Sequence, residues 1–297
     1  MTTDQRTDQA DPPAHEPVPL RPRPTTVVAE WEPGTFVENL APGPADDWFV
    51  TIPSHQRVDH VSAEGRTETV AELSRPVTGI VTDGGACYLL SGPLGEPGWR
   101  LLRLGPAGEG YPVSTVCELP DLIFGNGMTW AGRRLLIADS VRGLVLALDP
   151  RTGATERWLE HEWLTKTDPA TQLPGVNGIA VHAGQVYLTS TERALVLGCP
   201  LQPRPSGPRV LAGRLRADDL TVGADGRIYL ATHDQNSVLC LAPDGSRVDI
   251  AGAEQGATGC TAVAFDAGGR LYASTTGGIF NPRDGVVEAA RLLRITV

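Results

Sequence analysis

The feature that most constrains this chain is a hairpin pattern that recurs six times. Each copy holds a short apolar segment, a turn rich in Gly or Asp, and a second segment in which apolar and polar residues alternate. One clear copy runs from Asn126 to Asp139 and turns at Ala131-Gly132. Two strands joined by a tight glycine turn are typical of a β-hairpin. The first residues of the six copies are Glu38, Thr78, Asn126, Asn177, Asp218 and Thr261.

The spacing of these copies predicts the architecture. Successive copies begin 40, 48, 51, 41 and 43 residues apart, and a four-stranded propeller blade takes about 40–50 residues. A further strand pair follows the hairpins, for example residues 143–149 and 155–159. We therefore predict an all-β fold, a six-bladed β-propeller with four antiparallel strands per blade, in which residues 25–297 form a single domain.

The last copy tests this count, because only 36 residues follow Thr261. They are enough for three strands of the sixth blade. Residues 25–31 precede the first copy and have no other assignment. We expect them to supply the missing fourth strand, which would close the ring and remove an open sheet edge.

Composition excludes several other classes of protein. Gly (34) and Pro (25) are too frequent for a mostly helical chain, and a net charge of −10 argues against a nucleic-acid partner. Residues 1–24 contain six prolines and few large apolar residues, so we predict a disordered tail there. Neither a secretory signal nor a run of 18 apolar residues is present, so we expect a cytoplasmic protein without a membrane partner. The oligomeric state is left open.

The five cysteines are widely spaced and odd in number, without a C-x-x-C motif. A thiol nucleophile or a metal site is the functional interpretation. We favour small buried side chains in a reducing compartment.

The first residues of the six copies suggest a binding site. In a propeller the first strand of every blade lines the central channel, so these six side chains should recur at one height around the axis. All six contain oxygen, and the two carboxylates and two amides among them favour a hard cation. We expect one divalent ion, with Ca²⁺ favoured and Zn²⁺, Mg²⁺ and Mn²⁺ as alternatives. No Cys or His occupies the ring, which argues against structural zinc.

Two alternatives to this ring remain open. Asn-Gly is a common turn dipeptide, and Asp or Asn often opens a hairpin for local hydrogen-bonding reasons. A shift of one residue would also exchange Asp218 for Asp219. We choose Asp218, because it keeps the distance to Gly226 consistent with an inserted turn residue.

From Trp31 to Gly278 the sequence resembles a distant branch of the senescence-marker-protein/gluconolactonase (regucalcin-like) family of six-bladed propellers. The resemblance rests on Asn126-Gly127-Met128-Thr129, Ala138-Asp139-Ser140, Asn177-Gly178-Ile179-Ala180, Asp218 with its following strand, and Leu271-Tyr272-Ala273-Ser274-Thr275-Thr276.

The resemblance implies that Glu38, Asn126, Asn177 and Asp218 hold one divalent metal, which polarises a lactone or ester carbonyl. It also implies that Asp218 acts as a base toward water. The sequence departs from the family at Asn39-Leu40, where Gly-Pro is usual after the Glu. It departs again at Gly125, Val176 and Ala217, where Pro is usual.

Further candidates follow the second strand of several hairpins, near the end of the channel where the six ring residues are expected. His233 is a candidate catalytic residue that could shuttle protons, although a loop histidine without a catalytic part is the alternative. Candidate substrate-binding residues are Thr78, Thr261, His55, Asp139, Ser190 and Thr275.

These observations favour a metal-dependent hydrolase of a lactone or related ester, acting on a small-molecule substrate. The alternative is a strictosidine-synthase-like cyclase or isomerase of a specialised pathway, in which the ion is structural or acts as a Lewis acid. A third hypothesis is a non-catalytic propeller that serves as a binding platform.

Overall fold

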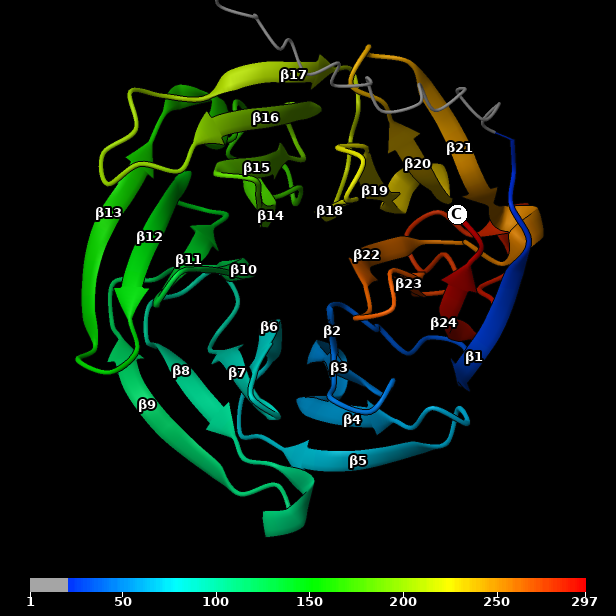
Figure 1. Ribbon diagram of the computed structural model, residues 1–297, viewed down its shortest axis with the longest axis horizontal. Helices are drawn as coiled ribbons and strands as arrows, with labels where there is room; N and C mark the ends of the chain where they lie inside the picture. Colours follow the sequence, from blue (N-terminus) through cyan, green and yellow to red (C-terminus); the bar gives the residue numbers. More distant parts are fainter. Residues whose placement is uncertain (1–20) are drawn as a thin grey trace, which may run out of the picture.

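The computed structural model describes residues 21–297 and has the predicted architecture. Six four-stranded antiparallel sheets are arranged in a ring around a central channel (Figure 1). The first three blades contain β2 (Leu40–Pro42), β3 (Trp48–Ile52), β4 (Arg57–Val61) and β5 (Thr67–Glu72); β6 (Val77–Asp83), β7 (Ala86–Ser91), β8 (Trp99–Leu104) and β9 (Val113–Leu119); and β10 (Gly125–Ala131), β11 (Arg134–Asp139), β12 (Leu144–Asp149) and β13 (Ala154–Glu160).

The remaining blades repeat this order, with short 3-10 turns in some connections. Their strands are β14 (Val176–His182), β15 (Gln185–Ser190), β16 (Leu195–Pro200) and β17 (Arg209–Gly213); β18 (Leu220–Val222), β19 (Ile228–Thr232), β20 (Ser237–Leu241) and β21 (Arg247–Gly252); and β22 (Cys260–Phe265), β23 (Leu271–Thr275), β24 (Ala290–Ile295) and β1 (Thr25–Trp31). The strands nearest the axis are β2, β6, β10, β14, β18 and β22, one from each sheet. The 3-10 turns are η1 (Pro53–His55), η2 (Ala107–Glu109), η3 (Glu162–Leu164), η4 (His233–Gln235), η5 (Ala253–Gln255) and η6 (Arg283–Gly285).

The N-terminal strand closes the ring as predicted. β1 pairs with β24 from Thr25 opposite Ile295 to Trp31 opposite Ala290, and Figure 1 shows the two strands side by side. The sixth blade therefore combines three C-terminal strands with one strand from the other end of the described chain.

The predicted tail, residues 1–24, falls for the most part outside the described residues. Its last four residues are described and have no regular secondary structure. The backbone N–H of Arg23 donates to the carbonyl oxygen of Ile250 at 2.6 Å. In the part of the chain that is described, no helix has the length and apolar character needed to cross a membrane.

Apolar side chains from neighbouring blades share each section of the core. Trp31 in the sixth blade packs in one cluster with Trp48 and Val50 of the first blade. The ring centroids of Trp48 in the first blade and Tyr272 in the sixth blade lie 4.5 Å apart. Since a blade buries its faces only against its neighbours, the six blades hold one another in place and fix the channel between them.

Glycines let the inner strands approach each other closely around the axis. A Cβ atom on Gly79 would lie 2.3 Å from the carbonyl oxygen of Asn126, and one on Gly127 would lie 2.3 Å from that of Asn177. A Cβ on Gly178 would meet the Cα of Asp219 at 2.6 Å. Each of these glycines directly follows one of the ring residues. The small residue at this position is thus a packing requirement of the axis.

Candidate functional site

Five of the six ring residues meet at one cavity on the axis. The cavity has a volume of about 680 Å³ and is lined by Glu38, Thr78, Asn126, Asn177 and Asp218. The sixth, Thr261, is buried, and its hydroxyl donates to the carbonyl oxygen of Val37 at 2.8 Å. It is not among the lining residues. The repeat register therefore brings together side chains that are up to 180 residues apart in the sequence.

The local alternative for the two Asn-Gly pairs is wrong. Asn126-Gly127 lies inside β10 and Asn177-Gly178 lies inside β14, and neither pair forms a turn. Both asparagines are 3% exposed. Each glycine is required because the next inner strand passes too close for a side chain. The asparagine before it lines the cavity and is not needed for a turn.

Asp218, and not its neighbour, faces the cavity. The carboxylate of Asp219 is not among the groups that line the cavity, and it accepts a hydrogen bond from the backbone N–H of Val263 at 3.3 Å. Burial raises the pKa of Asp219 to about 7, although the backbone N–H groups of Leu220 and Val263 lower it. The two adjacent carboxylates thus have different surroundings.

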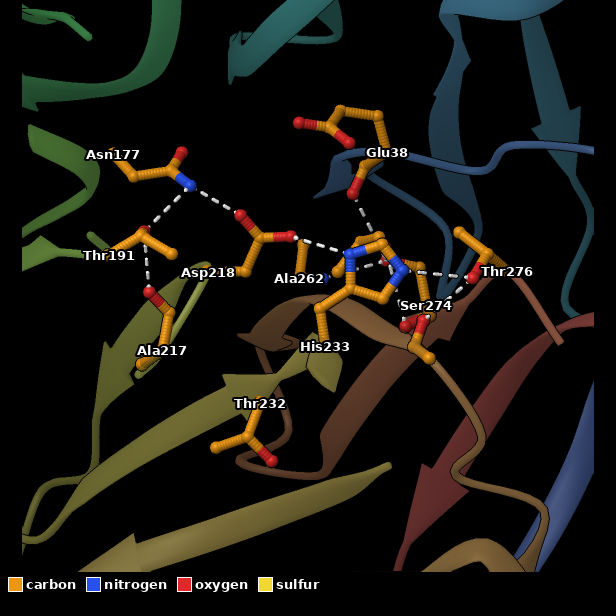
Figure 2. Close-up of polar contacts among 12 residues, drawn as sticks. Glu38, Asn177, Thr191, Ala217, Asp218, Thr232, His233, Ala262, Ser274 and Thr276 are labelled. Atoms are coloured by element: carbon orange, nitrogen blue, oxygen red, sulfur yellow. Dashed lines mark hydrogen bonds and ion pairs between the residues drawn. The ribbon is translucent and has the colours of Figure 1, made fainter. Parts of the chain in front are cut away.

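A hydrogen-bond network orients Asp218 (Figure 2). Asn177 Nδ2 donates to Asp218 Oδ1 and also to the hydroxyl of Thr191, the latter at 3.1 Å. The Thr191 hydroxyl in turn donates to the carbonyl oxygen of Ala217 at 2.8 Å. Since that hydroxyl has one hydrogen, it must accept from Asn177, which fixes the amide nitrogen beside it. The amide oxygen of Asn177 is therefore left for a ligand.

His233 faces the second oxygen of the same carboxylate. It begins η4 directly after β19, and its Nδ1 lies 3.5 Å from Asp218 Oδ2. Its Nε2 lies 3.1 Å from the hydroxyl of Thr276, which is fully buried. The imidazole ring lies against Phe36 and Phe280, at centroid distances of 5.8 and 5.2 Å. The ring is therefore held on both edges and on its sides.

Glu38 is the ring carboxylate without a protein partner among the described residues. Its side chain makes no hydrogen bond and no ion pair there, whereas Asp218 contacts Asn177 and His233. Figure 2 shows Glu38 beside the Asp218 network. Burial, and then the charges of Asp218 and Asp219, raise the pKa of Glu38 well above its ordinary value. An acid in this position is stabilised in its charged form by a cation.

The donor set fits a divalent ion with oxygen ligands. Within the described residues, no group of three or more His, Cys, Asp and Glu side chains is placed to hold a metal. The amides of Asn126 and Asn177 would therefore have to contribute beside Glu38 and Asp218. Carboxylate and carboxamide oxygens are ligands that suit Ca²⁺ and Mg²⁺.

Four further sequence candidates lie away from the cavity. Asp139 is fully buried and accepts hydrogen bonds from the backbone N–H groups of Ile123, Phe124, Val141 and Arg142. The Thr275 hydroxyl accepts from the N–H of Arg291 at 2.9 Å. Ser190 is buried without a hydrogen-bond partner in the described part of the chain. His55 is exposed and contacts Ser54. Asp139, Ser190 and Thr275 end second strands and His55 follows one, but none of the four lines the cavity. Asp139 stabilises loops, and Thr275 bonds to the neighbouring strand β24.

Sequence reasoning missed most of the cavity wall. Thr191 directly follows the candidate Ser190, and its role depends on a cross-blade contact that a sequence does not show. The apolar wall comes from Phe36, Leu94, Phe124, Leu173 and Phe280. These residues stand in connections of unequal length, where the repeat gives no register. Their loops all lie at the end of the channel where the inner strands begin.

The cysteines follow the favoured interpretation. All five are free thiols, and four of them are buried. Burial raises the pKa of the Cys87 thiol to about 12 and that of Cys240 to about 11. Thiols in such surroundings are poor nucleophiles at neutral pH.

Fold and site together define a six-bladed propeller whose axial cavity presents carboxylate and carboxamide groups. No protein-family model and no curated protein matches the sequence. Solved structures do match. The calcium-binding protein regucalcin from Agrobacterium tumefaciens is 15% identical, with a TM-score of 0.70 over 93% of this chain and 94% of that one.

Two enzymes show the same likeness. A gluconolactonase from Xanthomonas campestris is 12% identical, with a TM-score of 0.69 over 92% of this chain and 89% of that one. A luciferin-regenerating enzyme is 12% identical, with a TM-score of 0.68 over 89% and 92%. The resemblance read from the sequence is thereby confirmed at the level of the fold.

Proposed function

We propose that this chain is a metal-dependent hydrolase of a lactone or related ester that works in the axial cavity. One observation is central to the proposal. Glu38, Asn126, Asn177 and Asp218 line a single cavity, and Glu38 has no partner among the described side chains. Solved propellers of this fold include a gluconolactonase and a calcium-binding protein, which supports the same reading.

The four residues would hold the ion, with Ca²⁺ favoured by the oxygen ligands. When bound, the ion supplies Lewis acidity that polarises the substrate carbonyl and stabilises the developing oxyanion. Asn177 serves this arrangement through its orientation, because the Thr191 hydroxyl keeps the amide nitrogen on the Asp218 side.

Asp218 would accept the proton of the attacking water. Its position is fixed by Asn177 on one oxygen and His233 on the other. The water oxygen forms a bond to the carbonyl carbon, and the ring C–O bond then breaks. The departing alkoxide takes up a proton from the Asp218–His233 pair, so that the side chains return to their starting state.

Removing the Glu38 carboxylate tests the metal site. Chelator-treated protein should bind one Ca²⁺ per chain in a calorimetric titration. Glu38→Gln should weaken binding at least about tenfold, since mutation of residues that only hold a metal ligand in place already costs about 10–100-fold in metal affinity. Glu254→Gln, at an exposed position outside the cavity, is the matched control. Absence of any Ca²⁺, Mg²⁺, Mn²⁺ or Zn²⁺ binding by the unaltered chain would overturn the metal site.

Asp218→Asn tests the reaction. The change keeps the shape of the side chain but removes the base, so hydrolysis of a lactone panel should fall about 10²- to 10⁴-fold. A variant that keeps wild-type turnover would remove Asp218 as the base. Metal binding without hydrolysis of any lactone or ester would instead favour the cyclase alternative.

A further inference from the structure

We propose that the substrate bears a large apolar or aromatic group, and is thus a hydrophobic lactone or ester and not a polyhydroxylated sugar lactone. The inference rests on the proposed function for the reacting bond. The nature of the rest of the substrate follows from the cavity wall above the four oxygen-bearing residues.

Large apolar side chains cover much of the wall, beside polar residues such as Gln56 and Gln172. Phe36, Leu94, Phe124, Leu173 and Phe280 line it, together with three prolines. They come from separate connections, between β1 and β2, β7 and β8, β9 and β10, η3 and β14, and β23 and β24. Because five separate loops contribute apolar side chains, the apolar surface extends around the mouth of the cavity.

Two of these side chains are unusually open to solvent. Phe280 is 69% exposed and Leu94 is 49% exposed. Exposure of a phenylalanine side chain to water is unfavourable in free energy, and a ligand that covers the side chain removes this penalty. Phe280 also stands 5.7 Å from Phe36, centroid to centroid, so the two rings form one aromatic surface.

This aromatic surface lies next to the residues proposed to act in the reaction. His233 contacts both phenyl rings and also faces Asp218. A substrate with its carbonyl at Asp218 would therefore place the neighbouring part of its skeleton against Phe36 and Phe280. The contact favours a flat or extended apolar group there.

Several of the polar groups on the wall are already engaged by protein partners. The hydroxyls of Thr78 and Thr191 already donate to the carbonyl oxygens of Gly125 and Ala217. Arg216 pairs with Asp234 at 3.3 Å. Sugar hydroxyls against the phenyl and leucine side chains would lose hydrogen bonds to water without replacement.

The size of the cavity agrees with a larger molecule. About 680 Å³ lies well inside the range of 300–1,000 Å³ that is usual for sites of drug-sized ligands. A compact sugar lactone would leave much of the apolar wall wet. A lactone with an alkyl chain or fused aromatic ring would cover it.

Non-hydrolysable analogues separate this inference from the proposed reaction. Calorimetry would compare the δ-lactam analogue of δ-decalactone with D-glucono-δ-lactam, on the same Ca²⁺-loaded chain. The alkyl lactam should bind at least about tenfold more tightly, in line with the burial of several methylene groups. Equal binding of the two lactams, or tighter binding of the polyhydroxylated one, would overturn the inference.

Phe280→Ala locates the effect on the aromatic surface. The side chain is exposed, so the variant should fold, and it should weaken binding of the alkyl lactam several-fold while binding of the sugar lactam stays the same. Val286→Ala is the matched control, since Val286 is 62% exposed in the same connection but does not line the cavity. Equal affinities in the two variants would show that Phe280 does not contact the ligand and would contradict the proposal.

Hydrolysis of the parent lactones gives a separate result. If δ-decalactone is hydrolysed far faster than glucono-δ-lactone, both proposals stand. If the alkyl lactam binds but no lactone or ester is hydrolysed, the cavity preference stands and the hydrolase proposal fails. If glucono-δ-lactone is the better substrate, the hydrolase proposal stands and the apolar preference fails.

Discussion

The orientation of His233 depends on one buried hydroxyl. Thr276 is fully buried and is not a lining residue of the cavity, so it is a positioning residue. Its hydroxyl lies 3.1 Å from Nε2 and the carboxylate of Asp218 faces Nδ1. The imidazole is held between a hydroxyl and an acid, and the two partners together determine which nitrogen holds the proton.

Thr276→Val should therefore change how activity depends on pH. The substitution keeps the shape of the side chain but leaves Nε2 without its partner. We expect kcat to fall about tenfold, the pH profile of kcat to shift, and KM to stay within a factor of two, with rescue by Thr276→Ser. Stopped assays between pH 5 and 9 measure this.

The neighbouring Thr275→Val is the control for structural damage. Thr275 is equally buried and loses the hydrogen bond from the N–H of Arg291, but it does not touch His233. This loss matches that of the second bond of Thr276, whose hydroxyl also donates to the carbonyl oxygen of Gly259 at 3.3 Å. The pH profile of Thr275→Val should match that of the unaltered chain. A pH profile that is unchanged in Thr276→Val would mean that Thr276 has no part in positioning His233.

Among the elements, the hairpin of β22 and β23 shows how a turn stabilises a blade. Asp266 follows β22 with a side chain that is 3% exposed, and it accepts from the backbone and the guanidinium of Arg270, the latter at 2.6 Å. Burial alone would raise the pKa of Asp266, but these hydrogen bonds hold it below its ordinary value of 3.8. Arg270 also pairs with Asp46 of the first blade at 2.8 Å.

Asp266→Asn should therefore be destabilising in a pH-dependent way. A carboxyl whose pKa is lowered by folding contributes stability above its unfolded pKa, and this contribution is lost as pH falls through the folded value. The variant should lose about 1.5–3 kcal/mol at pH 7, and the difference should shrink toward pH 3. Urea titrations at both pH values measure it. Asp244→Asn, at the exposed turn between β20 and β21, should have little effect. A loss that is equal at the two pH values would contradict the role of the charge.

The elements also show what the sequence predicts and what it leaves out. Strand count was enough to assign β1 to the sixth blade, and repeat register was enough to bring Glu38 and Asp218 to one cavity. Asp139 was assigned to substrate binding, whereas its partners are backbone N–H groups of the loops before and after its strand, which have no pattern in sequence. The wall residues Leu173 and Phe280 were missed for a related reason, since they stand in connections outside the repeat.

On the scale of the whole molecule, ring closure depends on how β1 is held in the sixth blade, where it pairs with β24. Trp31 is 7% exposed, packs with side chains of both blades, and donates from Nε1 to Asp59 Oδ2 of β4 at 2.9 Å. All six junctions between blades are crossed by the chain, and residues 32–39 connect β1 of the sixth blade to β2 of the first. Strands from the two ends of the described chain meet inside the sixth blade, where the pairing of β1 with β24 and the packing of β1 replace a covalent connection.

Trp31→Ala should accordingly cost about 3–5 kcal/mol of unfolding free energy, as expected for a large buried aromatic side chain. Trp31→Phe should recover much of that loss, because it keeps the apolar contact and gives up only the hydrogen bond to Asp59. Val27→Ala, at a position of β1 that is 51% exposed, should stay within about 0.5 kcal/mol of the unaltered chain. Urea denaturation followed by tryptophan fluorescence and by circular dichroism measures all three. If Trp31→Ala were no more destabilising than Val27→Ala, the closing strand would contribute pairing with β24 alone, and the packing of Trp31 would have no part in holding the cavity residues Glu38 and Asp218 in register around the axis.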